Sequence, residues 1–426
     1  MAFDQAGRRA EVMKDSMPSA ELLSGINTYS EHTVQLQQVY ADLHIHIGRS
    51  EDGQPVKISG SRNLTFANIA KEASERKGIG LIGIIDCHSP GVRADIRTLI
   101  ATGEMSELPG GGIRYRDTTI LLGSEIEIRE PGQQECHVLV YFRDLERMDD
   151  FAEWMRTRMK NIQLSSQRLH TTYRELQQQT KQRGGLFMPA HMFTPHKGIY
   201  GSVTAHMSDV FDLELVDGGE LGLSADTTMA GYISELDRYP LFTNSDAHSL
   251  GKIGREYNVL RMKEASFDGL LGVLHGNEGA HIEANYGLDP RLGKYHRTYC
   301  RNCEHIIHES GAVLERCPYC GSTQLTIGVL DRVLHIADRS QPEPPADRPP
   351  YRYQVPLSFI PGLGPARMNR LLEVFGTEMA ILHRSSASEL EAVVGKEIAN
   401  YIVLAREGRL TLSAGGGGAY GKVVTG

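Results

Sequence analysis

The chain has 426 residues, of which 40% are hydrophobic and 23% charged, and its formal net charge is −8. This length exceeds what one ordinary hydrophobic core fills, so two or three domains are expected, and the composition excludes a disordered or fibrous protein. The sequence contains no run of about 18 apolar residues, so no membrane-spanning helix is predicted. Six cysteines, four of them in CxxC pairs, suit a reducing compartment. We therefore expect a globular cytoplasmic protein with no membrane partner.

Charge is distributed unevenly along the chain. Residues 286–426 hold 16 Lys+Arg and 14 Asp+Glu, whereas residues 1–285 hold 29 Lys+Arg and 39 Asp+Glu. Bound divalent cations are large local charges, so a carboxylate-rich site that collects them carries less negative charge than the residue count indicates. The charge distribution therefore neither requires nor excludes a nucleic-acid partner.

Short apolar segments recur through residues 37–285 and predict the strands of a catalytic domain. Residues 1–36, which have little apolar pattern, predict an N-terminal arm. Strands are predicted over residues 39–43, 80–86, 118–128, 136–142, 186–190, 213–216 and 241–243. Helical segments between them favour an α/β fold with a mostly parallel sheet.

Two of the helical segments are well marked. Residues 66–77 have helical spacing, with Asn63 or Thr65 as candidate cap and Gly78 as the stop. Residues 148–183 are rich in Gln and Arg and predict one long helix.

Histidines and carboxylates stand at the carboxyl ends of the predicted strands, where the active sites of α/β barrels converge. His44 and His46 are two residues apart at a strand end, so both side chains point to one side. Imidazole with carboxylate suits zinc, manganese or iron, and the number of such groups favours two or three divalent ions, Zn²⁺, Mn²⁺ or Mg²⁺, as in phosphoester hydrolysis. The candidate metal ligands are His44, His46, His88, Glu125, His137, His191, Asp246 and His248. Asp86 and Glu127 are predicted to orient these ligands.

The motifs that contain these ligands resemble those of the PHP superfamily, named for polymerase and histidinol phosphatase. They are DLHIH (42–46), IIDCH (84–88), GSE (123–125), CHVLV (136–140), PAH (189–191) and NSDAH (244–248). The resemblance implies a distorted (β/α)7 PHP barrel with a trinuclear metal site built from the eight candidate ligands. Members often carry a ninth ligand, a histidine, shortly after the first motif. This chain has no histidine in residues 48–52, so the ninth ligand is absent or is replaced by Asp52 or water.

A narrower resemblance is to the endonuclease Q family of DNA repair nucleases and covers about residues 38–426. It rests on GLSAD (222–226), TNSDAHS (243–249), IGRE (253–256), RPPY (348–351) and the CxxC pairs. The resemblance implies cleavage of DNA immediately 5′ of a deaminated base (uracil, hypoxanthine or xanthine) or an abasic site.

No Ser-His-Asp or Cys-His arrangement is recognisable, so a water activated by the metals is the expected nucleophile. Asp246, His248 and Glu125 would act through that water. Cations close to the ligand motifs could hold the phosphate, and the candidates are Arg255, Lys197 and Arg49. The pocket for the damaged base is not readable, and the residues suggested for it are Gly222–Asp226, Tyr200 and Tyr420.

Residues 286–340 contain Cys300, Cys303, Cys317 and Cys320. Two CxxC pairs with this separation predict a structural Zn²⁺ bound by four cysteines in a zinc-ribbon-like module. His296, His305 or His308 could replace one thiolate. The module serves either as a folding staple or as a clamp on nucleic acid. Residues 341–354 are rich in proline and predict an extended linker.

Residues 355–426 predict a C-terminal helical domain with a helix-hairpin-helix-like turn at Gly362-Leu363-Gly364. Amides at the start of the next helix can bind a DNA phosphate without reading sequence, and a weaker second copy surrounds Gly395. The DNA-binding candidates are Gly362, Gly364, Arg367 and Lys396, and the predicted packing face is Leu371, Leu372, Val374 and Phe375. A plain helical hairpin is the alternative. The glycine-rich tail, residues 413–420, predicts a flexible end.

The favoured function is therefore a metal-dependent DNA endonuclease whose partner is damaged DNA. A small-molecule phosphatase of the PHP type and a non-catalytic DNA-binding protein are the alternatives. The first would not need the cysteine and hairpin regions, and the second would not need a complete ligand set. A sliding clamp is a candidate partner, although no binding peptide is recognisable, and a monomer is expected.

Overall fold

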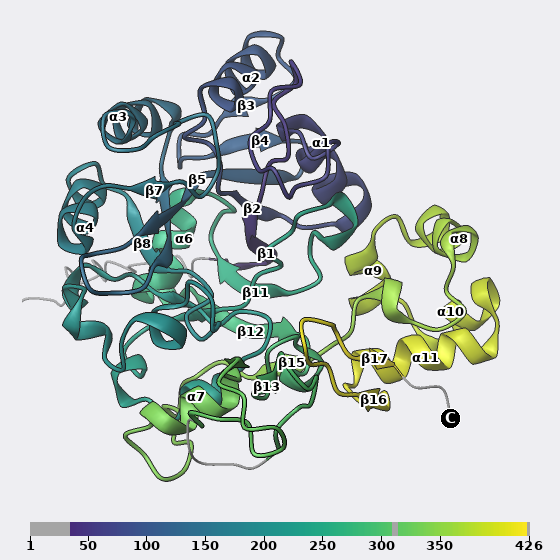
Figure 1. The fold of residues 1–426 in the computed structure, drawn as a ribbon. Helices are drawn as coiled ribbons and strands as arrows, with labels where there is room; N and C mark the ends of the chain where they lie inside the picture. The colour runs from purple at the N-terminus through teal and green to yellow at the C-terminus, as the bar shows by residue number, and fades with distance from the viewer. Residues whose placement is uncertain (1–34, 309–313, 424–426) are drawn as a thin grey trace, which may run out of the picture. The chain divides into compact units, whose positions relative to one another are not determined.

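The computed structural model describes residues 35–308 and 314–423, so all but the last two residues of the predicted N-terminal arm lie outside the described part. Its largest sheet contains the strands β1 Gln37–Ile45, β2 Leu81–Ile84, β3 Ser106–Glu107, β4 Ile113–Tyr115, β5 Thr118–Ile128, β6 Cys136–Phe142, β7 Arg168–Leu169, β8 Leu186–Pro189, β11 Tyr257–Met262, β12 His281–Gly287 and β15 Tyr351–Tyr353. The order is β15-β12-β11-β1-β2-β5-β4-β3, and β6 pairs with both β5 and β8 (Figure 1).

Hydrogen bonds close part of this sheet into a barrel. Just after β8, Met192 N donates to Glu220 O (2.8 Å). This hydrogen bond connects the β8 segment to the small sheet of β9 Gly219–Glu220 and β10 Leu241–Phe242. After β10, Ala247 bridges to Ile45 at the end of β1. The ring therefore runs β1–β2–β5–β6–β8–β9–β10 and back to β1, which agrees with the predicted distorted barrel.

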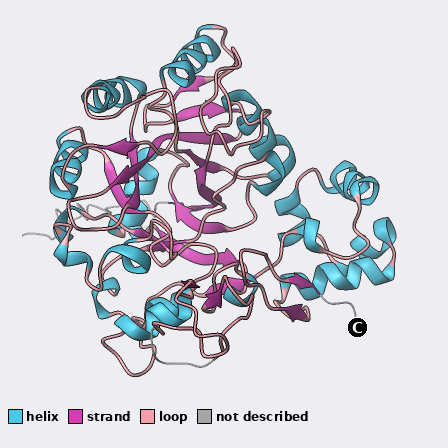
Figure 2. Cartoon of the chain, viewed as in Figure 1, coloured by secondary structure: helices cyan, strands magenta, loops and turns pink. Residues whose placement is uncertain are grey.

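Alternating burial explains why the barrel strands are almost continuously apolar. Leu81, Leu121 and Leu139 belong to one buried cluster, whereas their neighbours Ile82 and Ile120 belong to the other. Because successive side chains of a strand point to opposite faces, both faces of the sheet are covered by apolar groups. Figure 2 shows the strands at the centre of this region and helices around them.

The helices of the barrel region follow its strands. They are α1 Phe66–Lys71, α2 Pro90–Ala101, α3 Leu145–Arg156, α4 Tyr173–Gln182, α5 Thr227–Ala230 and α6 Phe267–His275. The predicted cap of α1 is confirmed, because the Thr65 side chain accepts a hydrogen bond from Asn68 N. A π-helical turn, Glu72–Lys77, continues α1 and ends at Gly78, whose φ of 76° is the left-handed conformation that glycine favours.

The sheet is mixed, so the prediction of a mostly parallel sheet was wrong. The pairs β1–β2 and β2–β5 are parallel, but β1–β11, β5–β6 and β6–β8 are antiparallel. The predicted strand at 213–216 was also wrong: Leu213–Leu215 is a short 3-10 turn, in which the Asp212 side chain accepts a hydrogen bond from Glu214 N. Asp212 favours a cap over a strand because its short carboxylate satisfies nearby amides.

The single long helix predicted over residues 148–183 is two helices, α3 and α4. Thr172 caps α4 by accepting from Glu175 N, and residues 157–172 form an irregular segment that includes β7. Ser166 has a φ of 50°, which a helix cannot contain. Helix propensity misled the sequence interpretation because the tertiary contacts of residues 165 and 166 override it.

The remaining elements are β13 Tyr299–Cys300, β14 Leu325–Thr326, α7 Val329–Ile336, α8 Pro365–Phe375, α9 Glu378–His383, α10 Ala387–Val394, α11 Lys396–Arg406, β16 Leu412–Ser413 and β17 Lys422–Val423. The predicted packing face of α8 is right for Leu371, which is fully buried, and wrong for Val374, which is 60% exposed. The tail predicted as a flexible end forms the β16–β17 hairpin. No helix in the described part of the chain is long and apolar enough to cross a membrane.

Glu256 is a fully buried carboxyl group beside the barrel, and it leads to a stability prediction. It accepts hydrogen bonds from Leu288 N (2.9 Å) and the Thr243 hydroxyl, and burial raises its pKa to about 7. A raised carboxyl pKa means that the folded state retains a proton that the unfolded state has lost. This group therefore makes the fold less stable as pH rises from about 4.5 to about 7.

We expect Glu256→Gln to increase the free energy of unfolding by about 2 kcal/mol at pH 8 and to change it little at pH 5, because the amide stays neutral. Melting temperatures at the two pH values measure the effect. Glu264→Gln, at an exposed position, is the matched control and should change neither value. An equal effect of Glu256→Gln at both pH values would contradict the assigned protonation.

Candidate active site

The first group of candidate ligands comes from the end of β1 and the segment after β10. His44 and His46 are buried. Asp246 reaches them from the segment after β10, in which Ala247 pairs with Ile45 at the end of β1. Asp246 Oδ1 lies 3.6 Å from His44 Nε2 and 3.5 Å from His46 Nε2. Asp246 has a φ of 45°, a conformation that costs energy and often occurs at functional sites.

The second group comes from β5, β6 and the end of β8. Glu125 Oε1 lies 2.7 Å from His137 Nδ1 and 3.3 Å from His191 Nε2. In each group, one ligand atom from every member lies within 4.8 Å of the others. Two sets of imidazole and carboxylate therefore face each other at one end of the barrel.

Glu125 joins the two groups. Its Oε1 is 3.6 Å from His44 Nε2 and its Oε2 is 3.6 Å from His46 Nε2. His44 Nε2 and His137 Nε2 are buried and have no hydrogen-bond partner among the described residues. Unpaired buried nitrogens are costly unless a further group binds them, so the residues present fit metal ions well.

Two of the eight predicted ligands stand outside these groups. His248 Nε2 lies 3.3 Å from Asp246 Oδ1, at the edge of the first group. His88 is buried, but its Nδ1 lies 2.7 Å from Ser124 Oγ and its Nε2 lies 3.3 Å from Leu164 O. Asp52, suggested as a replacement for a ninth ligand, is exposed and accepts a hydrogen bond from Ser50 Oγ (2.5 Å).

Carboxylates behind the first group orient its imidazoles. Asp86 Oδ2 lies 3.1 Å from His46 Nδ1, in the orienting place predicted for it, and Glu220 Oε2 lies 3.0 Å from His44 Nδ1. Although burial opposes both shifts, the Glu220 charge raises the pKa of His44 to about 10, and His46 lowers the pKa of Asp86 to about 2. The carboxylates thus favour positive charge here, the condition that also favours a metal cation.

Glu220 is a candidate site residue that the sequence analysis missed. Besides contacting His44, it accepts hydrogen bonds from His191 N (2.8 Å) and Asn244 Nδ2 (3.1 Å), so it connects three of the ligand-bearing segments. Glu220 lies outside every predicted strand and motif, and no neighbouring histidine marks it.

We expect Glu220→Gln to weaken metal binding and catalytic rate by about 10- to 100-fold, the usual effect of losing a charged partner of a metal-ligating histidine. Titration of metal-free protein with Mn²⁺, followed by rate measurements, tests this. Glu214→Gln, at an exposed position outside the site, should behave as wild type. Unchanged Mn²⁺ affinity of Glu220→Gln would contradict its orienting role.

Two of the three predicted phosphate-binding cations, Arg255 and Lys197, lie beside the ligands or their carboxylate partners. Arg255 Nε donates to Ser245 O (2.7 Å) and one Arg255 terminal amine donates to Asp246 O (3.4 Å). Lys197 Nζ lies 2.8 Å from Glu127 Oε2, and Glu127 in turn faces His137 Nε2 at 3.8 Å. Arg49 instead donates to Gly53 O (2.7 Å) in its own turn.

A pocket of about 240 Å³ opens directly beside the two ligand groups. It is lined by His191, Thr194, His196, Glu220, Gly222, Leu223, Ser224, Asn244, Asp246, Lys294, Tyr295 and Tyr420. The predicted segment 222–226 therefore contributes to it, and so does Tyr420, whose hydroxyl accepts a hydrogen bond from Arg255 (3.1 Å). Tyr200 does not line it, because its side chain is fully buried and its hydroxyl donates to Glu235 (2.7 Å).

Comparison with known proteins places this site in a family. A family model described as PHP-associated matches residues 228–278. The lesion-specific endonuclease PfuEndoQ from Pyrococcus furiosus has a crystal structure that is 31% identical, covers 91% of this chain and 95% of its own, and superimposes with a TM-score of 0.78. The chain belongs to the endonuclease Q family.

Two further relatives are similar over most of this chain. Endonuclease Q in a complex with a 27-mer duplex substrate carrying an abasic lesion at the active site is 30% identical, with a TM-score of 0.78 over 92% of this chain and 97% of that one. The uncharacterized protein YqxK of Bacillus subtilis (strain 168) is 50% identical over 391 residues, 91% of this chain and all of that protein. Membership of the endonuclease Q family confirms the predicted fold class and the prediction of a metal-dependent hydrolase of the endonuclease type.

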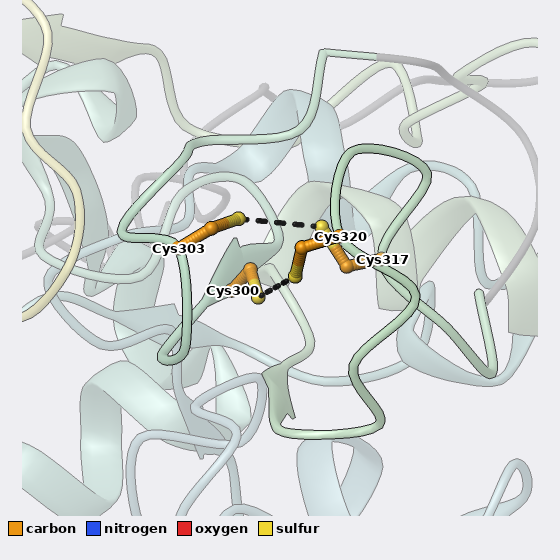
Figure 3. Close-up of side chains that lie close together, drawn as sticks. All are labelled: Cys300, Cys303, Cys317 and Cys320. Carbon is orange, nitrogen blue, oxygen red and sulfur yellow. Dashed lines mark hydrogen bonds between the residues drawn. The ribbon is translucent and has the colours of Figure 1, made fainter.

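The cysteine module of this endonuclease Q family member is compact (Figure 3). Sγ of Cys300 lies 3.7 Å from Sγ of Cys320, and Sγ of Cys303 lies 3.6 Å from Sγ of Cys317. A tetrahedral zinc site with Zn–S bonds of about 2.3 Å requires sulfurs about 3.8 Å apart, so the four thiols fit zinc. His305 turns its Nδ1 to Cys303 O (2.6 Å). The arrangement agrees with a zinc-ribbon-like module.

The predicted hairpin residues form two similar turns. Gly362 and Gly395 have φ values of 74° and 84°, and α8 and α11 begin just after these turns. Gly364 and Gly395, the residues that precede the helices, provide no side-chain cap, and the space around the Cβ position of each is open. Arg367 and Lys396 are exposed, and Arg367 donates to Gly362 O (2.8 Å).

Proposed function

We propose that the chain is a DNA repair endonuclease that hydrolyses the phosphodiester immediately 5′ of a deaminated base (uracil, hypoxanthine or xanthine) or an abasic site. The observation that carries the proposal is that the metal-ligand groups and the adjacent pocket share His191 and Asp246. A nucleotide held in that pocket would place its own phosphate beside the metals.

The ligand groups would hold the divalent ions, Zn²⁺, Mn²⁺ or Mg²⁺: His44, His46 and Asp246 on one side, and Glu125, His137 and His191 on the other, with His248 adjacent. Bound metals lower the pKa of water and stabilise charge on phosphate oxygens. Glu220 and Asp86 fix the imidazole orientations by accepting from their Nδ1–H groups. Arg255, held against Asp246, presents its positive charge to the phosphate from the rim.

The pocket is proposed to receive the damaged nucleotide. Extruding a base from the stack costs a few kcal/mol and costs least at a mispaired or missing base, which gives one source of selectivity. Tyr420 covers the pocket with an aromatic face against which Lys294 Nζ packs, 4.6 Å from the ring centroid. Backbone and hydroxyl groups of residues 222–224 offer hydrogen bonds to the base edge.

The two helical hairpins are proposed to bind the DNA backbone. The first-turn amides of α8 and α11 lack side-chain caps, so they can donate to phosphates, with the helix dipoles favouring negative charge. Arg367 and Lys396 add positive charge beside these turns. Such contacts position DNA without reading its sequence, as a lesion-directed enzyme requires.

Cleavage of labelled oligonucleotides tests the proposal. Purified protein with Mg²⁺ or Mn²⁺ is incubated with strands that contain uracil, hypoxanthine, xanthine, an abasic site or no lesion, and separately with p-nitrophenyl phosphate. We expect a nick directly 5′ of each lesion and none in undamaged DNA. Release of phosphate from the small ester alone would favour the phosphatase alternative, and binding of DNA without a nick would favour the non-catalytic one.

A further inference from the structure

Three positively charged side chains gather beside the pocket without a carboxylate partner. Lys252 and Arg255 come from the turn that follows His248, and Lys294 comes from the segment before β13. Partial removal from water lowers the pKa of Lys252 most, and the charges of Arg255 and Lys294 lower it further, so the three cations lie close enough to repel one another. In the described part of the chain, none of them forms an ion pair with a carboxylate. Positive charge concentrated in this way attracts an anion.

Two other lysines close to the candidate metal site are paired with carboxylates: Lys57 with Glu125 (3.3 Å) and Lys197 with Glu127 (2.8 Å). The negative charge that acts on Lys252 is that of Asp246, a candidate metal ligand. Divalent cations bound to Asp246 would neutralise this charge. The cluster of Lys252, Arg255 and Lys294 therefore needs a counter-charge from outside the chain.

The side chain of Arg255 is fixed between the metal site and the tail. Gly254 N donates to Asp42 Oδ2 (2.9 Å), which ties this turn to β1. Arg255 Nη2 donates to Asp246 O (3.4 Å), and Arg255 Nη1 donates to the Tyr420 hydroxyl (3.1 Å). A cation that is already held in place loses little conformational freedom when it binds an anion.

Tyr420 connects Arg255 to the third cation. Lys294 Nζ lies 4.6 Å from the centroid of the Tyr420 ring, and Arg255 Cζ lies 5.6 Å from the same centroid. Gly418 N donates to Lys294 O (3.4 Å), so the tail is held against the segment that carries the lysine. Because an aromatic ring attracts cations through its negative face, Tyr420 keeps both charges beside the pocket that it lines.

The pocket joins the cationic cluster to the candidate metal site. Its lining includes the ligands His191 and Asp246, and it also includes Lys294 and Tyr420. A nucleotide within a DNA strand has one phosphate on its 5′ side and one on its 3′ side. When the 5′ phosphate of a nucleotide in the pocket lies beside the metals, its 3′ phosphate is the remaining anion that this nucleotide brings.

We propose that Lys252, Arg255 and Lys294 form a second phosphate site, which binds the phosphodiester on the 3′ side of the damaged nucleotide while the scissile phosphodiester on its 5′ side lies at the metal site. This proposal rests on the proposed function for the position of the scissile phosphate. Arg255 lies between the two phosphates and contacts both. The extruded nucleotide is thus held at both ends by its backbone.

A second phosphate site accounts for the acceptance of lesions that differ in shape. Deaminated purines and pyrimidines differ in size, and an abasic site has no base, so contacts to the base cannot hold all of them equally. The two flanking phosphates are present in every case, and phosphate contacts position a strand without reading its bases. Selection of damaged over intact nucleotides then depends on the cost of extrusion and on the contacts that each base makes in the pocket.

Neutral methylphosphonates that replace single phosphates test which linkage is bound. Duplexes with one uracil carry the methylphosphonate either at the linkage on the 3′ side of the uracil nucleotide or three linkages further in the 3′ direction. We expect the first replacement to lower kcat/KM of the wild-type protein by about 10- to 100-fold, the usual worth of charge-assisted hydrogen bonds. The distant replacement should lower it less than threefold.

Lysine variants show whether the cluster is what binds that linkage. Lys252→Met combined with Lys294→Met should lower kcat/KM on unmodified uracil DNA by a similar factor, and the 3′ methylphosphonate should then cost less than a further threefold, because the contact is already lost. Lys252→Arg combined with Lys294→Arg keeps both charges and should stay within threefold of wild type. Lys71→Met, at an exposed position of α1, is the control. A methylphosphonate cost that is equal in wild type and in the double Met variant would overturn the proposal.

Binding measurements separate this site from catalysis. Fluorescence anisotropy gives Kd for the same duplexes with Mg²⁺ and Mn²⁺ withheld from the buffer, over a range of salt concentrations. The double Met variant, and equally the 3′ methylphosphonate with wild-type protein, should reduce the slope of log Kd against log salt by about one, the value for one phosphate contact. Unchanged slopes in both comparisons would refute the second phosphate site. Failure of wild-type protein to cut any lesion would refute the proposed function instead, since these slopes are measured without cleavage.

Discussion

Glu125→Gln is expected to lower kcat/KM for lesion-containing DNA by about 1,000- to 10,000-fold, on the scale of losing an essential catalytic group. Glu125 lies between the two ligand groups and contacts histidines of both: its Oε1 faces His137, His191 and His44, and its Oε2 faces His46. Glutamine has the same shape, but it carries no charge and one of its two terminal atoms cannot coordinate a metal. Both groups should therefore lose affinity together.

The measurement combines rates with elemental analysis. Glu125→Gln should retain fewer barrel metals than wild type after dialysis, and saturating Mn²⁺ should restore only part of the rate. Glu127→Gln is a comparison on the same strand, because Glu127 contacts Lys197 at the rim and should cost no more than about tenfold. Full metal content together with a nearly normal rate in Glu125→Gln would show that the two groups do not form one catalytic centre.

The part of this site that sequence could predict is the part carried by strand ends. His44, His191 and Asp246 lie at or after the ends of buried apolar runs, and carboxyl ends of such strands must gather at one end of a barrel whatever the details of its twist. His137 is an exception, because it lies at the start of β6, which runs antiparallel to β5. Strand positions 118–128 and 136–142 were predicted with the observed bounds for the same reason, since long apolar runs between turn residues leave little ambiguity.

What sequence could not predict depends on contacts between segments that are far apart in the chain. Glu220 and Lys57 carry no distinguishing local pattern, and only folding brings Glu220 to His44 and Lys57 to Glu125. The segment with Ser165 and Ser166 was hidden inside an apparently helical stretch, although Ser166 donates to the Glu125 carboxylate. Local propensity cannot report a hydrogen bond to a residue about 40 positions away.

The glycine-rich tail shows the same limit in another way. Four consecutive glycines usually indicate flexibility, but here they permit close packing. A Cβ at Gly416 would lie 2.4 Å from a side-chain carbon of Ile306, and one at Gly417 would lie 2.7 Å from the Tyr299 ring. Glycine is therefore needed for the tail to lie against the cysteine module, and this packing places Tyr420 at the pocket.

Cys320→Ser is expected to remove one zinc ion per chain, to make backbone amides of residues 298–308 and 314–326 exchange rapidly with solvent, and to lower lesion cutting at least tenfold. Among the described residues, the apolar cluster around the cysteines has three buried members, Cys300, Ile307 and Cys317, too few to order this segment without a metal. Cys320 itself is exposed, so replacing sulfur with oxygen disturbs no packing, and the effect isolates metal binding.

We expect activity to fall because the C-terminal tail would lose the surface on which it packs. Tyr299 and Ile306 form the surface on which Gly416 and Gly417 rest, and disordering them frees the hairpin that holds Tyr420 against Arg255. Tyr319→Ser, in the same turn and 55% exposed, should keep zinc, amide protection and activity. If Cys320→Ser loses zinc but cuts lesions as fast as wild type, the module only stabilises the fold. If it loses both zinc and cutting activity, the module helps to hold the damaged nucleotide.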